Sequence, residues 1–335
     1  GYRLIPEVLR RLGMKHVLCV PEQMVIDGDF PTVASPNPEN PEGFHLAVAL
    51  ADREGADFIL GSDPDADRVG IMVRTKDDDF VVISGNQTGV LLLDYLIGAK
   101  RRTGKMPDKP VALKTIVTTE MARAVAESYG VKCFDTFTGF KFMAEKKNAL
   151  EESGEGKVIF SYEESYGYML GDYVRDKDAV TASMLLTEMA AWYASQGLTL
   201  ADAMESLYEK YGYYSEKVTS FALEGKDGLS KMVSLMANLR AGAPEGFAGK
   251  KVLAVRDYKK GVRVAGGAEE KLDYPVSDVL FYELEGGAWV CIRPSGTEPK
   301  VKVYVNAVAE NHEASSALTQ SLLDAAVKFM NDNMD

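Results

Sequence analysis

The sequence predicts an α/β protein with a C-terminal α+β domain. Amphipathic helical stretches alternate with short apolar runs through the first part of the chain, a pattern typical of mixed, largely parallel sheets flanked by helices. After about residue 212 the pattern changes to successive strands with a pair of helices. The 335 residues are 46% hydrophobic and 26% charged, which is typical of a globular chain with two or three domains, each with its own core.

In the first part of the chain, the spacing of apolar residues and the positions of glycines predict where helices and strands lie. The stretch 5–12 has apolar side chains at helical spacing and ends at Gly13, and the stretch 45–53 likewise ends at Gly55. Short apolar runs follow these helices and are typical of buried strands. The expected helices are 5–12, 45–53, 88–97, 120–129, 142–150 and the long run 180–211. The expected strands are 16–20, 58–60, 111–113, 131–134 and 157–160.

Composition shifts divide the chain into three expected domains. An acidic turn at 74–79, whose carboxylates we interpret as solvated, separates the first α/β unit from the second, and the run 180–211 closes the second. In the last domain the expected strands are 217–223, 251–258, 279–284, 288–293 and 300–306, and the expected helices are 230–239 and 315–330. The domains are therefore expected at 1–79, 80–212 and 213–335.

Charge and composition exclude several classes of partner. Lys and Arg number 38 against 50 Asp and Glu, so the net charge is −12, which argues against nucleic acid because binding it requires clustered cations. Small phosphorylated ligands stay compatible with this charge, since a few local donors hold them. No apolar run approaches the roughly 20 residues that span a bilayer. Three widely separated cysteines lack metal-ligand spacing, which favours reduced thiols in a cytoplasmic protein.

The strongest local signal is the segment 61–68, GSDPDADR, which follows an expected strand. Asp63, Asp65 and Asp67 occupy alternate positions, so a tight turn can direct all three carboxylates at one hard cation such as Mg²⁺ or Ca²⁺. An EF-hand is disfavoured because Arg68 stands where that loop requires glycine. The alternative is a solvated acidic turn.

A second segment, 293–300, has the sequence RPSGTEPK. Gly296 lets successive backbone N–H groups turn toward one point, Ser295 and Thr297 add hydroxyl donors, and Arg293 adds a forked donor suited to phosphate. The segment therefore predicts an anion site. It lacks the spacing of a P-loop, and an ordinary turn between two strands is the alternative.

A third segment, 162–167, has the sequence YEESYG and follows a buried strand. Adjacent carboxylates and a hydroxyl at a strand end suit hydrogen bonding to sugar hydroxyls, and the cations of RDKD at 175–178 could hold an anion. The turn TFTGFK at 136–141 is comparable, because its glycine permits close backbone approach. Each of these motifs alone is also ordinary loop chemistry.

Taken in this order, the motifs make the chain resemble the α-D-phosphohexomutase superfamily, the phosphoglucomutases and phosphomannomutases. The resemblance covers nearly the whole chain. EESYG and RDKD resemble the larger phosphoglucomutase and phosphopentomutase branch more than the short phosphomannomutase branch. The motifs that carry the resemblance are FPTVASPNPENPE at 30–42, DPDADR at 63–68, TGFK at 138–141, EES at 163–165, RDKD at 175–178 and RPSGTEP at 293–299.

The resemblance implies an isomerase that interconverts sugar 1-phosphate and sugar 6-phosphate through a phosphoserine enzyme, with a glucose 1,6-bisphosphate-type activator. By the same resemblance Asp63, Asp65 and Asp67 would hold Mg²⁺, and Arg68 would stabilise the transferring phosphate. Lys114, just past a strand end, is a weaker candidate for acid/base catalysis, with a merely solvated lysine as the alternative. The residues implied in sugar phosphate binding are Thr138, Gly139, Glu163, Ser165, Lys177, Arg293, Ser295, Gly296 and Thr297.

In the resembled family a serine in a TASHNP-like loop of the first of four domains carries the phosphate, and this sequence contains no such loop. Ser35 lies in ASPNP, lacks the histidine and falls in the second-domain segment, so we do not assign it as the nucleophile. The chain is therefore expected to be a fragment that binds Mg²⁺ and sugar phosphate weakly and shows no turnover alone.

Other classes of function stay open. A phosphopentomutase of the same superfamily and a non-catalytic protein that binds sugar phosphates both fit the motifs. A phosphatase of the haloacid dehalogenase type also combines aspartates with Mg²⁺, but the sequence has no DxDxT pattern and carries the RPSGTEP segment instead.

Overall fold

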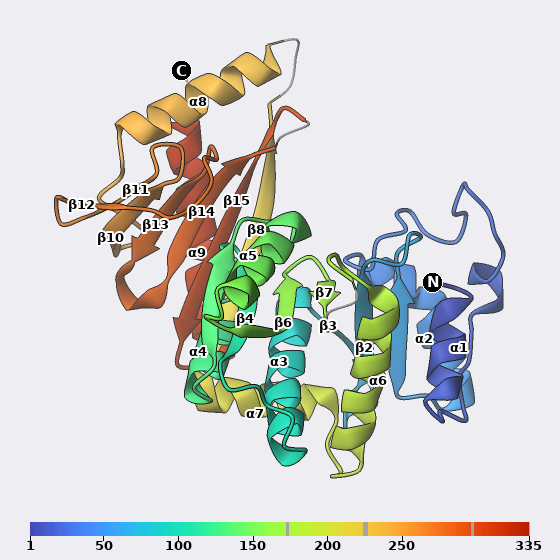
Figure 1. Cartoon of the computed structure of the whole chain (residues 1–335). Helices are drawn as coiled ribbons and strands as arrows, with labels where there is room; N and C mark the ends of the chain where they lie inside the picture. Colours follow the sequence, from blue (N-terminus) through green and yellow to red (C-terminus); the bar gives the residue numbers. More distant parts are fainter. Residues whose placement is uncertain (172–173, 224–226, 296–297, 335) are drawn as a thin grey trace. The chain divides into compact units, whose positions relative to one another are not determined.

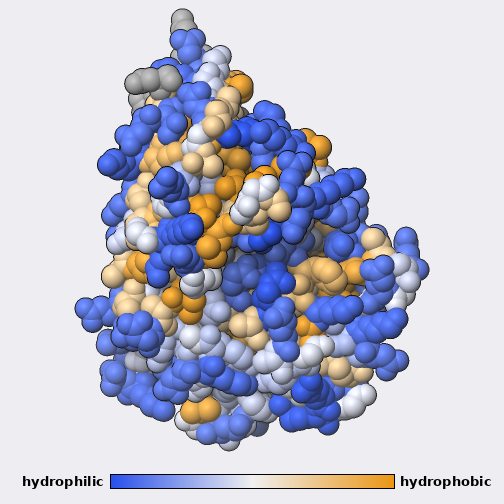
Figure 2. All heavy atoms as spheres, turned by 90° about the vertical axis from the view of Figure 1, so that its left-hand side faces the viewer, coloured by the Kyte–Doolittle hydropathy of each residue, from blue (hydrophilic) through white to orange (hydrophobic). Residues whose placement is uncertain are grey.

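The structure is a computed structural model that describes residues 1–171, 174–223, 227–295 and 298–334. The chain divides into two compact units, Gly1–Tyr211 and Gly212–Asp335 (Figure 1). Among the described residues, no helix combines the length and the apolar character that crossing a bilayer requires. Hydrophilic side chains cover much of the face seen in Figure 2, as the charged composition predicts.

The first sheet of unit 1 is a three-stranded antiparallel sheet with strand order β1-β2-β3. One face of β1 and β2 packs against α2, where Phe44, Ala51, Ile59 and Met72 form a small core. The expected domain boundary after residue 79 falls just before β3, inside this sheet. The elements are α1 (Leu4–Arg11), η1 (Pro21–Gln23), η2 (Pro41–Phe44), α2 (His45–Glu54), β1 (Phe58–Ser62), β2 (Val69–Arg74) and β3 (Phe80–Ile83).

One expectation for this region is wrong. Residues 16–20 form no strand, because an apolar run becomes a strand only where a neighbouring strand takes up its backbone hydrogen bonds, and no described residue does so here. The strands β1 and β2 pair antiparallel, so residues 63–68 are a hairpin connection.

The second sheet of unit 1 has four strands in the order β5-β4-β6-β7. The central strand β4 runs parallel to β5 and β6, as the alternation of helix and strand predicted, and β7 turns back antiparallel to β6. The strands are β4 (Pro110–Thr115), β5 (Lys132–Thr136), β6 (Lys157–Glu163) and β7 (Gly167–Met169). The helices are α3 (Gly85–Arg102), α4 (Met121–Ser128), α5 (Phe140–Glu152), α6 (Ala179–Ala194) and α7 (Leu200–Tyr211).

Helices cover both faces of this sheet. Val111 and Leu113 of β4 point toward α5, where Phe140 and Met143 complete a core. The alternate β4 residue Lys114 points to the other face, where it pairs with a residue at the start of α4. The expected long helix 180–211 is two helices, because Gly197 between them adopts a left-handed φ of 73°.

Unit 2 is an eight-stranded sheet whose strands all pair antiparallel, with two helices on one face. The strand order is β12-β11-β10-β13-β14-β15-β8, with β9 beside β10. Side chains of α8 and α9 share one core with alternate residues of β13, β14 and β15. The elements are β8 (Tyr213–Ala222), α8 (Gly228–Ala241), β9 (Gly246–Phe247), β10 (Lys250–Asp257), β11 (Val262–Ala265), β12 (Ala268–Lys271), β13 (Leu280–Leu284), η3 (Glu285–Gly287), β14 (Trp289–Pro294), β15 (Lys300–Ala309) and α9 (His312–Asn331).

The architecture agrees with the fold class expected from the sequence, α/β units followed by an α+β unit. Every expected element of the last domain overlaps an observed one. The sequence analysis did not predict β2, β3, β7, β9, β11 and β12. Most of these strands are short and lie at sheet edges, whereas β2 is the central strand of the first sheet.

Candidate functional site

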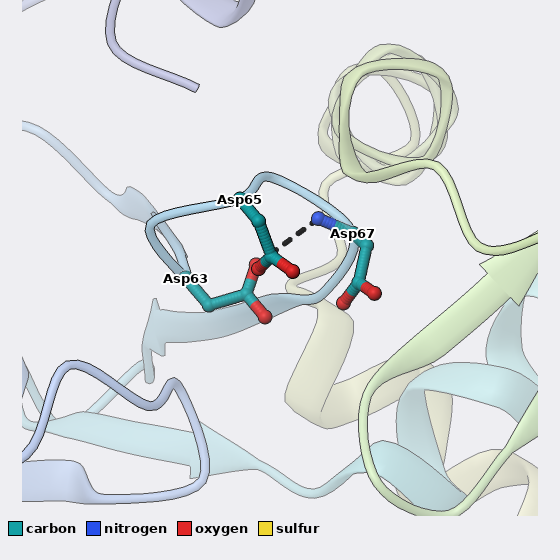
Figure 3. Close-up of side chains that lie close together, drawn as sticks. All are labelled: Asp63, Asp65 and Asp67. Carbon is teal, nitrogen blue, oxygen red and sulfur yellow. Dashed lines mark hydrogen bonds between the residues drawn. The ribbon is translucent and has the colours of Figure 1, made fainter.

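The acidic segment forms a six-residue connection between β1 and β2, and we refer to residues 63–68 as the metal loop. Each of Asp63, Asp65 and Asp67 offers a carboxylate oxygen within 4.8 Å of the others. Figure 3 shows the three carboxyl groups gathered at the loop. Ala66 adopts a left-handed φ of 58°, which closes the loop tightly.

Asp63 holds the loop together with one of its carboxylate oxygens. Its Oδ1 accepts hydrogen bonds from the backbone N–H groups of Asp67 at 3.1 Å and Arg68 at 3.0 Å. Its other oxygen takes no part in these bonds. Burial raises the pKa of Asp63 to about 6, with further increases from the charges of Asp67 and Asp65 and against the hydrogen bond from Arg68.

The strands that carry the metal loop are packed closely against the preceding segment. Gly61 of β1 and Gly70 of β2 are cross-strand partners. A Cβ on Gly61 would lie 2.7 Å from the ring of Phe44, and one on Gly70 would lie 2.9 Å from the carbonyl oxygen of Pro38. Only glycine permits this approach, so the 30–42 segment and its neighbour Phe44 fix the position of the hairpin.

Two cationic side chains flank the metal loop. The guanidinium of Arg68 lies 3.1 Å from Glu39 and 3.8 Å from Asp67, and it is partly exposed. The ammonium of Lys177 lies 2.9 Å from the Asp67 carboxylate and 3.2 Å from Asp176. The structure thus brings both expected phosphate contacts of unit 1 beside the aspartates. The sequence did not identify Glu39 as a partner of Arg68, because the two residues lie far apart along the chain.

The turn between β6 and β7 carries the EES motif, and we refer to residues 163–167 as the sugar loop. The Glu163 carboxylate is buried and accepts a short hydrogen bond from the backbone N–H of Gly139. Burial and the neighbouring charge of Glu164 raise the pKa of Glu163. The structure therefore joins two motifs that the sequence identified separately, TGFK and EES.

Other predicted residues lie beside this contact. The Oγ1 of Thr138 is shielded from solvent and meets no hydrogen-bond partner in the described part of the chain. Ser165 is half-buried in the turn. A buried polar group without a partner costs free energy, so Thr138 is suited to a ligand or water that approaches Gly139.

The metal loop and the sugar loop are connected through the backbone. The N–H of Val69 donates to the carbonyl of Tyr166 at 3.2 Å, and Arg68 forms an isolated β-bridge with Gly167. The N–H of Ala179, at the start of α6, donates to the carbonyl of Ala66 at 3.0 Å. The aspartates, the sugar loop and the RDKD segment therefore form one framework in unit 1.

Lys114 does not lie at the surface, so the alternative of a solvated lysine is wrong. It is fully buried, and its ammonium lies 2.8 Å from Glu120 and 3.1 Å from Asp135. Arg123 closes the network with contacts of 3.0 Å to Glu120 and 2.6 Å to Asp135. Burial opposes the charge of Lys114, but Asp135 and Glu120 raise its pKa. A shielded ammonium with such partners fits a structural ion-pair network better than proton transfer to a substrate.

The RPSGTEP segment of unit 2 lies in the turn between β14 and β15. Arg293 is half-buried near the end of β14, and the N–H of Ser295 donates to the carbonyl of Lys300 at 2.8 Å. The Oγ of Ser295 accepts from the N–H of Glu298 at 3.3 Å. The other two predicted residues of this phosphate site, Gly296 and Thr297, lie outside the described residues.

Comparison with protein-family models finds three matches in chain order. They are Phosphoglucomutase/phosphomannomutase, alpha/beta/alpha domain II, over residues 1–76, alpha/beta/alpha domain III over residues 84–211, and the C-terminal domain over residues 238–318. This chain belongs to the phosphoglucomutase/phosphomannomutase family. It is thereby a member of the α-D-phosphohexomutase superfamily, which confirms the resemblance that the motifs carried.

Relatives in this family are similar over most of the chain. A phosphoglucomutase of Staphylococcus epidermidis is 34% identical over 96% of this chain and 58% of its own length. A phosphoglucomutase of Staphylococcus aureus strain MRSA252 is 35% identical over 90% of this chain and 54% of its own length. This chain therefore spans little more than half the length of these phosphoglucomutases.

Solved structures show the same fold. A phosphoglucomutase/phosphomannomutase family protein from Burkholderia thailandensis aligns with a TM-score of 0.63 at 20% identity, covering 97% of this chain and 57% of its own. Parafusin, a phosphoglucomutase from Paramecium, aligns with a TM-score of 0.61 at 18% identity, covering 98% of this chain and 55% of its own.

Proposed function

We propose that this chain supplies the metal, sugar and phosphate loops of a phosphohexomutase that interconverts sugar 1-phosphate and sugar 6-phosphate. The observation that carries the proposal is the backbone connection between the metal loop and the sugar loop. Through it, the oxygen donors of Asp63, Asp65 and Asp67 lie in one framework with Glu163 and Lys177. Membership of the phosphoglucomutase/phosphomannomutase family supports the same reaction.

The donor set of the metal loop fits Mg²⁺. Three carboxylates within 4.8 Å of one another are hard oxygen ligands, and Asp63 keeps one oxygen outside its two backbone hydrogen bonds. When bound, Mg²⁺ supplies positive charge near the oxygens of a transferring phosphoryl group. Asp63, Asp65 and Asp67 would hold it.

The remaining residues would position the sugar phosphate. Arg68 and Lys177 donate N–H groups to phosphate oxygens in place of their present carboxylate partners. Glu163 and Ser165 would bind sugar hydroxyls, with the Thr138 hydroxyl as a further donor and the N–H of Gly139 orienting the Glu163 carboxylate. In unit 2, Arg293, Ser295, Gly296 and Thr297 would bind the phosphate that is not transferred. These residues would promote the reaction by positioning the substrate and stabilising charge, as phosphoryl transfer requires.

The phosphoryl carrier in this proposal is a serine outside these residues, because the sequence contains no TASHNP-like loop. The serine phosphate passes to the sugar monophosphate, and the resulting bisphosphate turns round and returns its other phosphate to serine. A glucose 1,6-bisphosphate-type activator would restore the phosphoserine whenever the bisphosphate dissociates.

Metal binding is the first test. Titration of the chain with Mn²⁺, followed by electron paramagnetic resonance and by competition with Mg²⁺, is expected to show one site that Asp65→Asn weakens at least tenfold, about the loss of one ionic ligand. Asp77→Asn, in the solvated acidic turn, is the matched control and should leave the affinity unchanged. Equal affinities in the two variants would contradict the metal assignment.

Turnover is the second test. The chain alone is expected to show no conversion of glucose 1-phosphate in a coupled dehydrogenase assay. Joined to the remaining part of the Staphylococcus epidermidis phosphoglucomutase, it is expected to gain activity that Asp65→Asn removes. Conversion by the purified 335 residues alone would contradict the placement of the serine outside them.

The same joined protein identifies the sugar. Glucose, mannose and pentose phosphates share the phosphate group, so discrimination rests on the hydroxyl contacts of Glu163 and Ser165. Comparison of kcat/KM across these substrates separates a phosphoglucomutase from a phosphomannomutase or a phosphopentomutase. Binding without turnover in every case would favour a non-catalytic sugar-phosphate-binding protein.

A further inference from the structure

Glu164 lies between two residues proposed to bind sugar hydroxyls, but its own contacts lead away from them into the sheet. Its Oε2 lies 3.1 Å from the hydroxyl of Thr115 and 3.2 Å from that of Thr118. Both threonines are completely buried. Both hydroxyls donate to this one oxygen, so a single acceptor atom at position 164 joins the sugar loop to the two threonines.

The two threonines are themselves fixed to the central strand. Thr115 is the last residue of β4, which lies between β5 and β6. The N–H of Thr118 donates to the carbonyl of Thr115 at 3.1 Å, and their hydroxyls lie 2.8 Å apart. The Glu164 carboxylate is therefore tied to the end of a strand that has neighbours on both sides.

The backbone of Glu164 is fixed from another side by the first turn of α3. A Cβ on Gly85 would lie 2.0 Å from the carbonyl oxygen of Glu164, so α3 packs directly on this peptide group. The same Cβ would lie 2.9 Å from the backbone nitrogen of Tyr166, and Asn86 accepts from the N–H of Thr119 at 3.0 Å. The first turn of α3 thus contacts both the sugar loop and the turn after β4.

The turn that these contacts surround contains a residue with an intrinsically unfavourable backbone conformation. Tyr166 has a left-handed φ of 64°, a strained conformation for a non-glycine residue that persists only where the surroundings impose it. Ser165 stands between this residue and Glu164. Anchoring on both sides therefore determines where the Ser165 hydroxyl and the Glu163 carboxylate are held.

We propose that Glu164 is a positioning residue that holds the sugar loop in its binding geometry through Thr115 and Thr118 and makes no contact with the sugar itself. The inference rests on the proposed function of Glu163 and Ser165. It predicts that the hydrogen-bond acceptor at position 164 matters, whereas its negative charge does not. It also predicts that sugar binding and metal binding respond differently, because the metal loop is closed by its own Asp63 contacts.

The test measures glucose 6-phosphate affinity by calorimetry at fixed Mg²⁺, and Mn²⁺ affinity separately, for the whole chain and four variants. Glu164→Ala is expected to weaken glucose 6-phosphate binding about tenfold, equivalent to about 1.4 kcal/mol. Glu164→Gln, which keeps an acceptor oxygen, should stay within about twofold of the unmodified chain, and Thr118→Val should weaken binding about threefold. Glu155→Ala, an exposed glutamate of the same unit, is the control.

Hydrogen exchange supplies a readout that does not depend on the ligand. Glu164→Ala and Thr118→Val should both accelerate exchange in residues 163–168, while Mn²⁺ affinity stays unchanged. Equal binding by Glu164→Ala and the unmodified chain would overturn the inference. The inference would also be overturned if Glu164→Gln bound glucose 6-phosphate as weakly as Glu164→Ala. The same holds if Glu164→Ala weakened this binding while Thr118→Val left it unchanged. In both cases the carboxylate would act directly on the ligand. A folded, unmodified chain that binds Mn²⁺ but no glucose 6-phosphate would overturn the proposed sugar site, and this inference with it.

Discussion

The ammonium of Lys177 lies 2.9 Å from the carboxylate of Asp67. One member of this pair belongs to the RDKD segment before α6 and the other to the metal loop. Burial opposes the charge on Lys177, but the hydrogen bond to Asp67 raises its pKa, so the lysine stays cationic. A resident cation therefore contacts one of the three proposed Mg²⁺ ligands.

This pair predicts opposite effects on two ligands. Lys177→Met should raise Mg²⁺ affinity about fivefold, because it removes a cation that repels the metal and competes for Asp67. The same variant should weaken glucose 6-phosphate binding, because it removes a donor to phosphate. Mn²⁺ titration and calorimetry measure the two effects. Lys141→Met, at the start of α5, is the control. A loss of affinity for both ligands in Lys177→Met would contradict the competition.

The pKa of Asp63 predicts how metal binding depends on pH. Burial, with the charges of Asp67 and Asp65, raises this pKa to about 6 against the N–H of Arg68. Mg²⁺ binds the carboxylate and not the carboxylic acid, so the affinity is highest above pH 6 and falls as the pH decreases through 6. The expected slope below the pKa is about tenfold per pH unit, the value for release of one proton.

Mn²⁺ titrations between pH 5 and pH 8 measure this dependence. Asp77→Asn should reproduce the profile of the unmodified chain, because its carboxyl lies in the solvated turn outside the loop. An Mn²⁺ affinity that does not change between pH 5 and pH 8 would contradict the proposal that Asp63 binds the metal and titrates near pH 6.

Lys114 predicts a loss of stability rather than a change in proton transfer. Its neighbour Glu120 has a pKa lowered to about 2 because Lys114 and Arg123 outweigh the effect of burial. Among the residues that the structure describes, Lys114→Met would leave Glu120 and Asp135 with only Arg123 as a cationic partner. Breaking a buried ion pair typically costs about 3–5 kcal/mol. Urea denaturation measures the free energy of unfolding, with the exposed Lys105→Met as the control. Unchanged stability together with lost turnover in the joined protein would restore Lys114 as an acid/base candidate.

The sequence predicted the metal loop because its geometry is local. Alternate aspartates in a six-residue connection cannot move far apart, so the spacing of Asp63, Asp65 and Asp67 was enough to bring their carboxylates together. Glu163 and Ser165 are two residues apart, so the chain itself also keeps them in one turn. Their surroundings were not predictable in this way, because the contact of Lys177 with Asp67 and that of Glu164 with Thr115 depend on how separate strands assemble.

Lys114 and the segment 16–20 illustrate the same limit. A lysine at a strand end is usually solvated, and nothing in its neighbourhood along the chain shows that Asp135 of β5 lies beside it. An apolar run such as 16–20 indicates that burial is favourable, but pairing with another strand decides whether a strand forms. The edge strand β12 was missed for a related reason, since its sequence AEEK is mostly charged and shows no alternating apolar pattern.

At Gly89 of α3, close packing favours glycine, whereas helix propensity favours alanine. A Cβ at this position would lie 2.0 Å from the ring of Tyr162, which is fully buried and stacked on Phe160 at 5.5 Å between ring centroids. Alanine favours a helix over glycine by about 1 kcal/mol, but the ring cannot retreat without disturbing its stack. Gly89→Ala should therefore destabilise the chain by about 1–3 kcal/mol, the usual cost of overpacking a core.

Gly98 provides the matched control in the same helix. A Cβ there would meet only the end of the Arg102 side chain, at 3.0 Å, and a flexible side chain can move away. Gly98→Ala should accordingly stabilise the chain by up to about 1 kcal/mol through helix propensity alone. Urea denaturation of both variants decides between the two effects. If Gly89→Ala were stabilised as much as Gly98→Ala, close packing of α3 on Tyr162 would not constrain the strand that leads into the sugar loop.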